Sequence, residues 1–333
     1  MIVPQHWAEA RRQVRRGKRQ ISVRRFGWSD DSLEAAQAMA DRRADEALAR
    51  IEAGEFLTRS EPKVPYNGAD GLPIREEIVA RHGAAIVTRN SYGARCLNVP
   101  DVLFADVDLK QGPGLVLSVM TSAVLSLLVI GIGWQRMNWV AGVSAVIVCL
   151  LVGVWLAGVI HKVREQLAGS PDEAGLRDIR AFCDRRPNWK VRVYRTPAGL
   201  RVVALHRTFE PADAEVQEFF DAIGTDPVYA RMCRNQNCFR ARLSAKPWRI
   251  GIESRLRPRP GVWPVREEAR EERRRWIEAY DAAARGYAAC RLIDEIGLGM
   301  TDSRARDIAD LHDRESGARQ SLPIAYPPAT PSP

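Results

Sequence analysis

The sequence is poor in the side chains that bind metals and form disulfides. Its 333 residues include only 5 histidines and 6 cysteines, and the cysteines are scattered along the chain. Cys233 and Cys238 are the closest pair, with no second cysteine pair and no histidine near them. This arrangement is neither a zinc framework nor a disulfide lattice, so we expect reduced thiols.

The chain also lacks the signals of secretion and of ion transport. Basic residues near the N-terminus are not followed by an apolar segment, so we expect no cleavable signal peptide. Two long apolar runs in the middle contain no ionisable residue, which argues against a transporter or an ion pathway. The sequence has no internal repeat.

These two apolar runs predict a transmembrane helical hairpin at 113–161. The runs cover 115–134 and 139–160, and each is long enough to cross a hydrocarbon core of about 30 Å at roughly 1.5 Å per residue. Only residues 135–138 separate them, and Trp134 and Trp139 bracket this turn, where interfacial tryptophans are favoured. The first partners that we expect are therefore membrane lipids.

The orientation of the hairpin follows from its flanking positive charges. The turn has one, Arg136, whereas the flanks have more. Cytoplasmic loops carry the excess of lysine and arginine. We therefore expect a two-pass protein of a bacterial-type inner (plasma) membrane with both termini in the cytoplasm. The flanking charges are Arg89, Arg95, Lys110, Lys162 and Arg164.

Both apolar runs contain small residues at four-residue spacing, which places each set on one helix face and allows close approach of backbones. Two interpretations stay open: the two helices pack on each other, or the faces form a homo-oligomer. The residues are Gly114, Ser118, Ser122 and Ser126 in the first run, and Ala141, Ala145, Cys149, Gly153 and Ala157 in the second.

The flanks of the hairpin predict one cytoplasmic α+β domain. We expect a basic, loosely ordered segment at 1–28, helices and strands at 29–112, the remainder of the domain at 162–264, a long amphipathic helix at 265–298, and a tail at 299–333 with a disordered end. The predicted helices are Ser29–Ala53, Ile74–Gly83, Ser170–Trp189 and Pro211–Gly224, and the predicted strands are Ala84–Arg89, Ala94–Val99, Val102–Leu109, a hairpin over Val191–His206, and Cys238–Ser244.

The order of these elements predicts a ferredoxin-like or palm-like domain. If the membrane hairpin is removed, the chain from Val102 onward reads strand, helix, strand, strand, helix, strand, which is the order of a split βαβ unit. The hairpin is then an insertion between the first strand and its helix.

Asp106 and Asp108 are the candidate metal ligands and catalytic residues. Side chains alternate along a strand, so both carboxylates lie on one face at its carboxyl end. A divalent cation such as Mg²⁺ relieves their repulsion and commonly binds carboxylates together with phosphate oxygens. A solvated strand end is the competing interpretation.

Basic residues on the following elements are candidates for phosphate binding, because arginine makes bidentate contacts to phosphate. A solvated basic face is the alternative. His206 is a further catalytic candidate, with a packed or surface histidine as its alternative. The phosphate-binding candidates are Arg195, Arg201, Arg240, Arg242, Lys246 and Arg249.

The segments FADVDL (104–109) and YRTPAGLRVVALH (194–206) resemble two motifs of the palm of the archaeo-eukaryotic primase superfamily. In that family a D-x-D strand is followed by a hairpin with a small polar residue, a glycine and a histidine, and then by a further acidic residue. Here Arg201 follows Gly199-Leu200, and His206 comes later. The third acidic motif is missing, because CFRARLSAKPWR (238–249) is basic.

The segment FADVDLKQ is also similar to the first strand of a diguanylate cyclase palm, but the glycine-rich acidic turn of those enzymes is absent from RTPAGL. Both resemblances imply a palm-like fold over about 90 residues around the insertion.

Two functions are consistent with the sequence. Net charge is +9, and a basic chain favours anionic partners such as nucleotides, nucleic acid or lipid headgroups. The first function is a binding or scaffold role for an anionic ligand or partner at the membrane surface. The alternative is a metal-dependent nucleotidyl or phosphoryl transfer enzyme that uses Asp106 and Asp108 with Mg²⁺.

Overall fold

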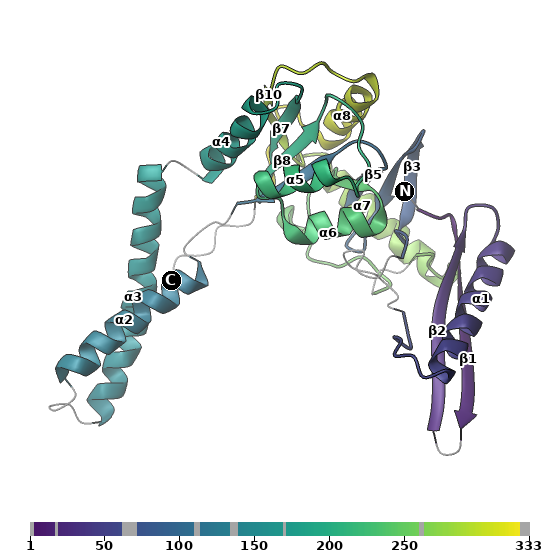
Figure 1. The fold of residues 1–333 in the computed structure, drawn as a ribbon, viewed down its shortest axis with the longest axis horizontal. Helices are drawn as coiled ribbons and strands as arrows, with labels where there is room; N and C mark the ends of the chain where they lie inside the picture. The colour runs from purple at the N-terminus through teal and green to yellow at the C-terminus, as the bar shows by residue number, and fades with distance from the viewer. Residues whose placement is uncertain are drawn as a thin grey trace.

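The computed structural model describes residues 3–16, 19–61, 72–109, 114–133, 139–168, 171–259 and 263–326. It has an α+β fold with antiparallel sheets. Figure 1 shows a central α/β body from which two units project to opposite sides. The expected turn at 135–138, the expected cap at Ser170 and the proline-rich end at 327–333 lie outside the described residues.

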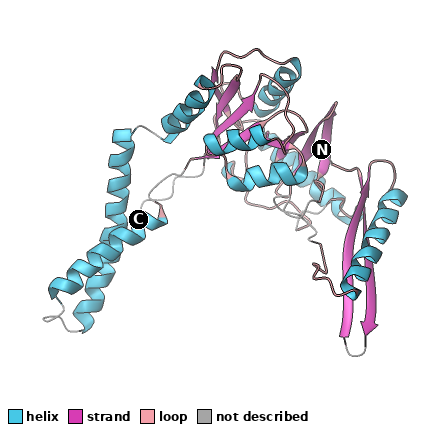
Figure 2. Cartoon of the chain, viewed as in Figure 1, coloured by secondary structure: helices cyan, strands magenta, loops and turns pink. Residues whose placement is uncertain are grey.

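The body contains two antiparallel sheets, whose orders are β10-β7-β8-β6 and β3-β4-β5-β9. The helices α4–α8 surround them (Figure 2). The strands are β3 (Glu77–His82), β4 (Ala85–Arg89), β5 (Arg95–Val99), β6 (Phe104–Asp108), β7 (Val191–Arg195), β8 (Gly199–Ala204), β9 (Phe239–Arg242) and β10 (Arg291–Ile296). The helices are α4 (Pro171–Asp184), α5 (Ala214–Ala222), α6 (Pro227–Gln236), α7 (Arg270–Ala284) and α8 (Ser303–Ser316).

The two sheets meet at β6 and β9, where side chains connect the strands. The Tyr229 hydroxyl lies 3.0 Å from the carbonyl oxygen of Phe104 on β6 and 2.9 Å from that of Arg240 on β9. Arg201 on β8 donates to the Arg242 carbonyl at 2.9 Å. The expected strands are present in the expected order, but two helices, α5 and α6, separate β8 from β9 where one was expected. Strand β9 is hydrogen-bonded to β5 and belongs to the second sheet.

Helices cover both faces of the β10-β7-β8-β6 sheet. Phe182 of α4 and Phe219 of α5 pack edge to face in the main core. On the other face, the ring of His312 in α8 lies against Phe104 and Tyr194. Because Phe104, Asp106 and Asp108 alternate onto one face of β6, the acidic pair lies on the face that α8 covers.

The N-terminal segment is a β-ribbon and not the loosely ordered segment that we expected. Strands β1 (His6–Arg16) and β2 (Arg19–Ser29) pair in antiparallel register, and α1 (Leu33–Glu52) packs on them through alanines. Gly27 permits this contact, since a Cβ there would lie 2.1 Å from the Ala36 carbonyl oxygen. The predicted first helix is present, but its expected start and cap, Ser29, is the last residue of β2, and Ser32 caps the helix instead.

Three other predicted elements are wrong. Within Ile74–Gly83, residues Glu77–His82 form strand β3, and Gly83 (φ +61°) makes the turn into β4 and does not end a helix. The long helix at 265–298 ends at Ala284, and Arg291–Ile296 alternates between exposed and less exposed positions as strand β10. The tail at 299–333 contains α8, which Asp302 caps and whose apolar side is buried.

The second projection consists of the helices α2 (Leu115–Gly133) and α3 (Trp139–Ala168), which pack on each other. Within the described residues, Ala141–Ile160 is the one helical segment long and apolar enough to cross a membrane, and the apolar part of α2, Leu115–Gly131, is shorter. Many of their large apolar side chains are exposed, including Leu127, Leu151 and Trp155.

Small residues line the contact between α2 and α3. A Cβ on Gly153 would lie 2.5 Å from the Cα of Ser122, so the backbones are in close contact. Thr121 donates to the Gly153 carbonyl at 2.8 Å, and Ser122 donates to the Leu150 carbonyl at 3.3 Å. Ala157 is fully buried. Some of the small residues that could contact a second copy of the chain therefore lie in the contact between α2 and α3.

Candidate functional site

The negative charge of Asp106 is paired with an arginine within the body. It lies opposite Arg201 in the β6–β8 ladder, and Arg201 holds both carboxylate oxygens, with Nε–Oδ1 at 2.7 Å and Nη2–Oδ2 at 3.0 Å. The Arg201 side chain is 3% exposed and that of Asp106 is 30% exposed. This bidentate pair joins adjacent strands, so both charges have a structural partner.

Asp108 has a different environment although it is only two residues away. It lies at the end of β6 and is exposed. Partial burial, together with the charges of Asp106 and Asp226, raises the pKa of its carboxyl group, and Lys246 and Arg242 oppose this rise. No ion pair joins Asp108 to any residue in the described parts of the chain.

Asp226 is a third carboxylate that sequence reasoning missed. Its backbone N–H donates to the Asp106 carbonyl at 2.9 Å, and its side chain accepts from the Val228 N–H at 3.0 Å. It therefore caps α6 and is held beside the end of β6. The segment TDPVYA has the cap-and-proline pattern of a helix start, which was the available signal.

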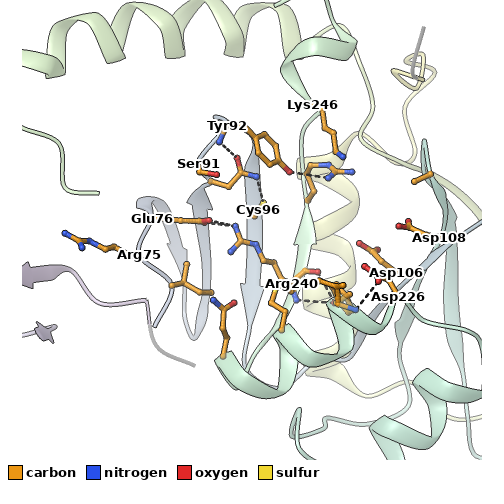
Figure 3. A pocket seen from close by; sticks show the side chains of 18 residues that line it. Arg75, Glu76, Ser91, Tyr92, Cys96, Asp106, Asp108, Asp226, Arg240 and Lys246 are labelled. Carbon is orange, nitrogen blue, oxygen red and sulfur yellow. Dashed lines mark hydrogen bonds and ion pairs between the residues drawn. The ribbon is translucent and has the colours of Figure 1, made fainter. Parts of the chain in front are cut away.

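These three carboxylates line a pocket of ≈ 320 Å³ between β6, β9 and α6. Figure 3 shows Asp106, Asp108 and Asp226 gathered on one side, Glu76 and Arg240 on the opposite side, and Tyr92 and Lys246 along a third. The remaining lining residues on which the site depends are Arg242, Gln236 and Met232.

Four cations line the pocket: Arg75, Arg240, Arg242 and Lys246. Arg75 lies over the rings of Trp7 and Phe26 and donates to the Trp263 carbonyl oxygen. Arg240 is held by both oxygens of Glu76, at 2.8 and 2.6 Å. Arg242 donates to the Tyr92 hydroxyl at 3.4 Å, and Lys246 lies over the Trp248 ring. Among the described residues, neither Arg242 nor Lys246 forms an ion pair with a carboxylate.

The charge of Arg242 disfavours the positive charges of Lys246 and Arg249. Burial, with the charges of Arg242 and Arg249, lowers the pKa of Lys246 to about 8. Burial, followed by the charge of Arg242, also lowers the pKa of Arg249. A bound anion relieves repulsion of this kind.

Two predicted site residues lie elsewhere. Arg195 forms an ion pair with Asp172 of α4. His206 packs against Trp189 and Phe209, and burial lowers its pKa. It follows β8 at the end opposite Gly199, which pairs with Asp108. Neither residue lines the pocket, and the predicted phosphate ligand Arg249 does not line it either. Arg201 lies behind Asp106.

A buried polar network lies behind Asp106, and sequence reasoning missed it. His312 Nε2 lies 3.4 Å from Arg201 Nη1 and 3.8 Å from Cys290 Sγ. Asp313 accepts from Tyr194 at 2.5 Å and from Arg192 at 2.9 Å. The network fixes α8 on the sheet and so fixes Arg201.

The carboxylates do not fit a divalent metal site of the palm type. Asp106 is engaged by Arg201, and one oxygen of Asp226 caps α6. No group of three or more histidine, cysteine, aspartate or glutamate side chains could hold a metal ion in the part of the chain that is described. Only Asp108 has both oxygens without a hydrogen bond from the described residues.

Comparisons with known proteins identify no family for this chain. The chain matches no family model, and no curated protein or solved structure shows significant similarity to it.

Proposed function

We propose that this chain is a membrane-anchored binding protein whose α/β body holds a phosphate-bearing anion in the pocket between β6 and β9. One observation carries the proposal: Arg242 and Lys246 converge on the pocket without a carboxylate partner among the described residues. Unpaired, partly buried cations are unfavourable unless an anion neutralises them. Arg249 does not line the pocket, but its positive charge interacts with that of Arg242.

The anchor is the α2–α3 hairpin. Its exposed apolar side chains would be unfavourable in water and favourable in lipid. The contact between the helices through Ser122 and Gly153 is typical of membrane helices. We propose two passes, with both termini on the cytoplasmic side of a bacterial-type inner membrane.

A palm-like transfer enzyme is the weaker alternative. One observation favours it: Asp108 and Asp226 bring two carboxylates into a pocket that also contains cations. The missing third metal ligand opposes it. Nucleoside triphosphates titrated with Mg²⁺ or Mn²⁺ test this alternative, which requires metal-dependent binding that Asp108→Asn abolishes.

Titration calorimetry of the detergent-purified chain with inorganic phosphate tests the binding proposal. Because a charge-assisted hydrogen bond contributes about 1.5–3 kcal/mol, Arg242→Gln should weaken binding at least about tenfold. The matched control is Arg306→Gln, which removes an exposed arginine of α8 and should leave binding unchanged. Equal loss in both variants, or no binding to the unaltered chain, would contradict the proposal.

Alkaline phosphatase fused at Met137 tests the anchor. The fusion should be active, because the proposed turn lies outside the cytoplasm, and a fusion after Ala325 should be inactive. The reverse pattern would overturn the orientation, and activity at neither position would overturn the membrane crossing.

A further inference from the structure

The pocket has two walls of opposite charge, and the proposed anion accounts for only one of them. Arg242 and Lys246 form the basic wall, and Asp108 and Asp226 lie on the acidic wall. Opposite charges this near one another usually form ion pairs, yet none joins the two walls in the described residues. The walls therefore face each other across open volume.

The acidic wall is short of positive charge. Arg201 is engaged by Asp106, and Arg240 is engaged by Glu76, so neither is free for Asp108 or Asp226. Each carboxylate lies in the field of the others, which disfavours ionised Asp108. A hydroxyl group would donate a hydrogen bond there, whereas an ammonium group would donate hydrogen bonds and also neutralise charge.

A further polar atom in the lining has no partner. The side-chain oxygen of Gln236, Oε1, is buried and accepts no hydrogen bond from the described residues. A buried acceptor of this kind is costly unless a donor reaches it. The pocket thus presents acceptors as well as cations, and a bare phosphate would satisfy only the cations.

We propose that the ligand is a phosphate ester that carries an ammonium group, with its phosphate on Arg242 and Lys246 and its ammonium between Asp108 and Asp226. This proposal rests on the proposed anion-binding function and deepens it. The chemistry is shared by a free phosphorylated amine and by the headgroup of an aminophospholipid, which the membrane hairpin would bring close to the pocket.

The two requirements can be separated with matched small molecules. Phosphoethanolamine and ethyl phosphate share the phosphate, and only the first carries an ammonium group. Calorimetric titration of the detergent-purified chain should show phosphoethanolamine binding at least about tenfold more tightly than ethyl phosphate. Equal affinities would overturn this proposal and leave the anion-binding function intact, whereas no binding of either compound or of inorganic phosphate would overturn both.

Variants of the acidic wall should remove the preference for phosphoethanolamine over ethyl phosphate and should leave phosphate binding intact. Asp108→Asn is isosteric, and Asp226→Asn keeps a good helix-capping residue. In the double variant, affinity for phosphoethanolamine should fall to that for ethyl phosphate, while affinity for ethyl phosphate stays the same or rises. If the preference persists in this folded variant, the assignment of the ammonium site is wrong.

Vesicles separate the two sources of the ligand. The chain carries Val228→Cys, a lining position beside Asp226 that is partly exposed and is not one of the proposed ligands. It is reconstituted in phosphatidylglycerol vesicles with or without phosphatidylethanolamine, and protection of the new thiol from alkylation is measured. Protection by phosphatidylethanolamine assigns the lipid headgroup, and protection only by added phosphoethanolamine assigns a free ligand. Protection by neither overturns the proposal.

Discussion

The carboxyl ends of β6 and β9 show the same arrangement with opposite charge. On β6, Asp106 is paired with Arg201, and Asp108 has no ion pair among the described residues. On β9, Arg240 is paired with Glu76, and Arg242 likewise has no carboxylate partner. On each strand, the paired side chain maintains the fold, and the unpaired side chain is available to a ligand.

The largest effect should come from the buried pair on β6. Asp106→Ala leaves the buried Arg201 guanidinium without its carboxylate, which typically costs about 3–5 kcal/mol. We expect thermal melting of the detergent-purified chain to fall by about 10 °C, with Asp108→Ala as the matched control. A similar fall in both variants would show that the paired Asp106 stabilises the fold no more than the unpaired Asp108 does.

A smaller loss should follow from the pair on β9. Glu76→Gln keeps the shape of the side chain but removes the negative charge that pairs with Arg240. We expect this change to lower the free energy of unfolding by about 2 kcal/mol. Arg242→Gln is the control and should leave the melting temperature unchanged or raised. If Arg242→Gln destabilises the chain more than Glu76→Gln does, the unpaired arginine is structural.

Lys246 should give anion binding a pH dependence. Its lowered pKa of about 8 means that its charge is present below that pH and is lost as the pH rises through it. Affinity for sulfate, whose own charge is constant over this range, should therefore fall above pH about 8. Lys246→Gln should bind sulfate more weakly and should flatten this step, so an unchanged profile would show that Lys246 does not contact the anion.

The smallest effect concerns Asp108 and its raised pKa. The folded state binds the proton more tightly than the unfolded state, so ionised Asp108 lowers stability once the pH exceeds its ordinary pKa of 3.8. Asp108→Asn should raise the melting temperature slightly at pH 7, and this gain should vanish as the pH falls through the raised pKa towards 3.8. A gain that is independent of pH would show that charge is not its cause.

Much of the fold could be predicted because its patterns are local. The hairpin of β7 and β8, the strand β6 with both aspartates on one face, and the helix α1 follow from periodicity and turn residues. By contrast, β1 and β2 are charged strands that become stable through an alanine-lined contact with α1. The two strands follow each other directly in the chain, but their many arginines leave too little apolar alternation for periodicity to reveal them.

Some residues of the pocket could also be predicted, because the patterns that place them are local. Alternation placed Asp106 and Asp108 together, and the basic stretch after Cys238 supplied Arg240, Arg242 and Lys246. Which of these charges are paired depends on the order of strands and on contacts with distant segments. Arg201 lies beside Asp106 because β8 pairs with β6, and Glu76 reaches Arg240 from across the second sheet.

The most direct test compares thermal melting with and without phosphate for the unaltered chain and for the double variant Arg242→Gln with Lys246→Gln. Ligands that bind only the folded state raise its melting temperature. We predict that both proteins melt alike, or the variant slightly higher, without phosphate, and that phosphate stabilises only the unaltered chain. A variant that is destabilised in the absence of phosphate, or is stabilised by phosphate as much as the unaltered chain, would contradict this prediction.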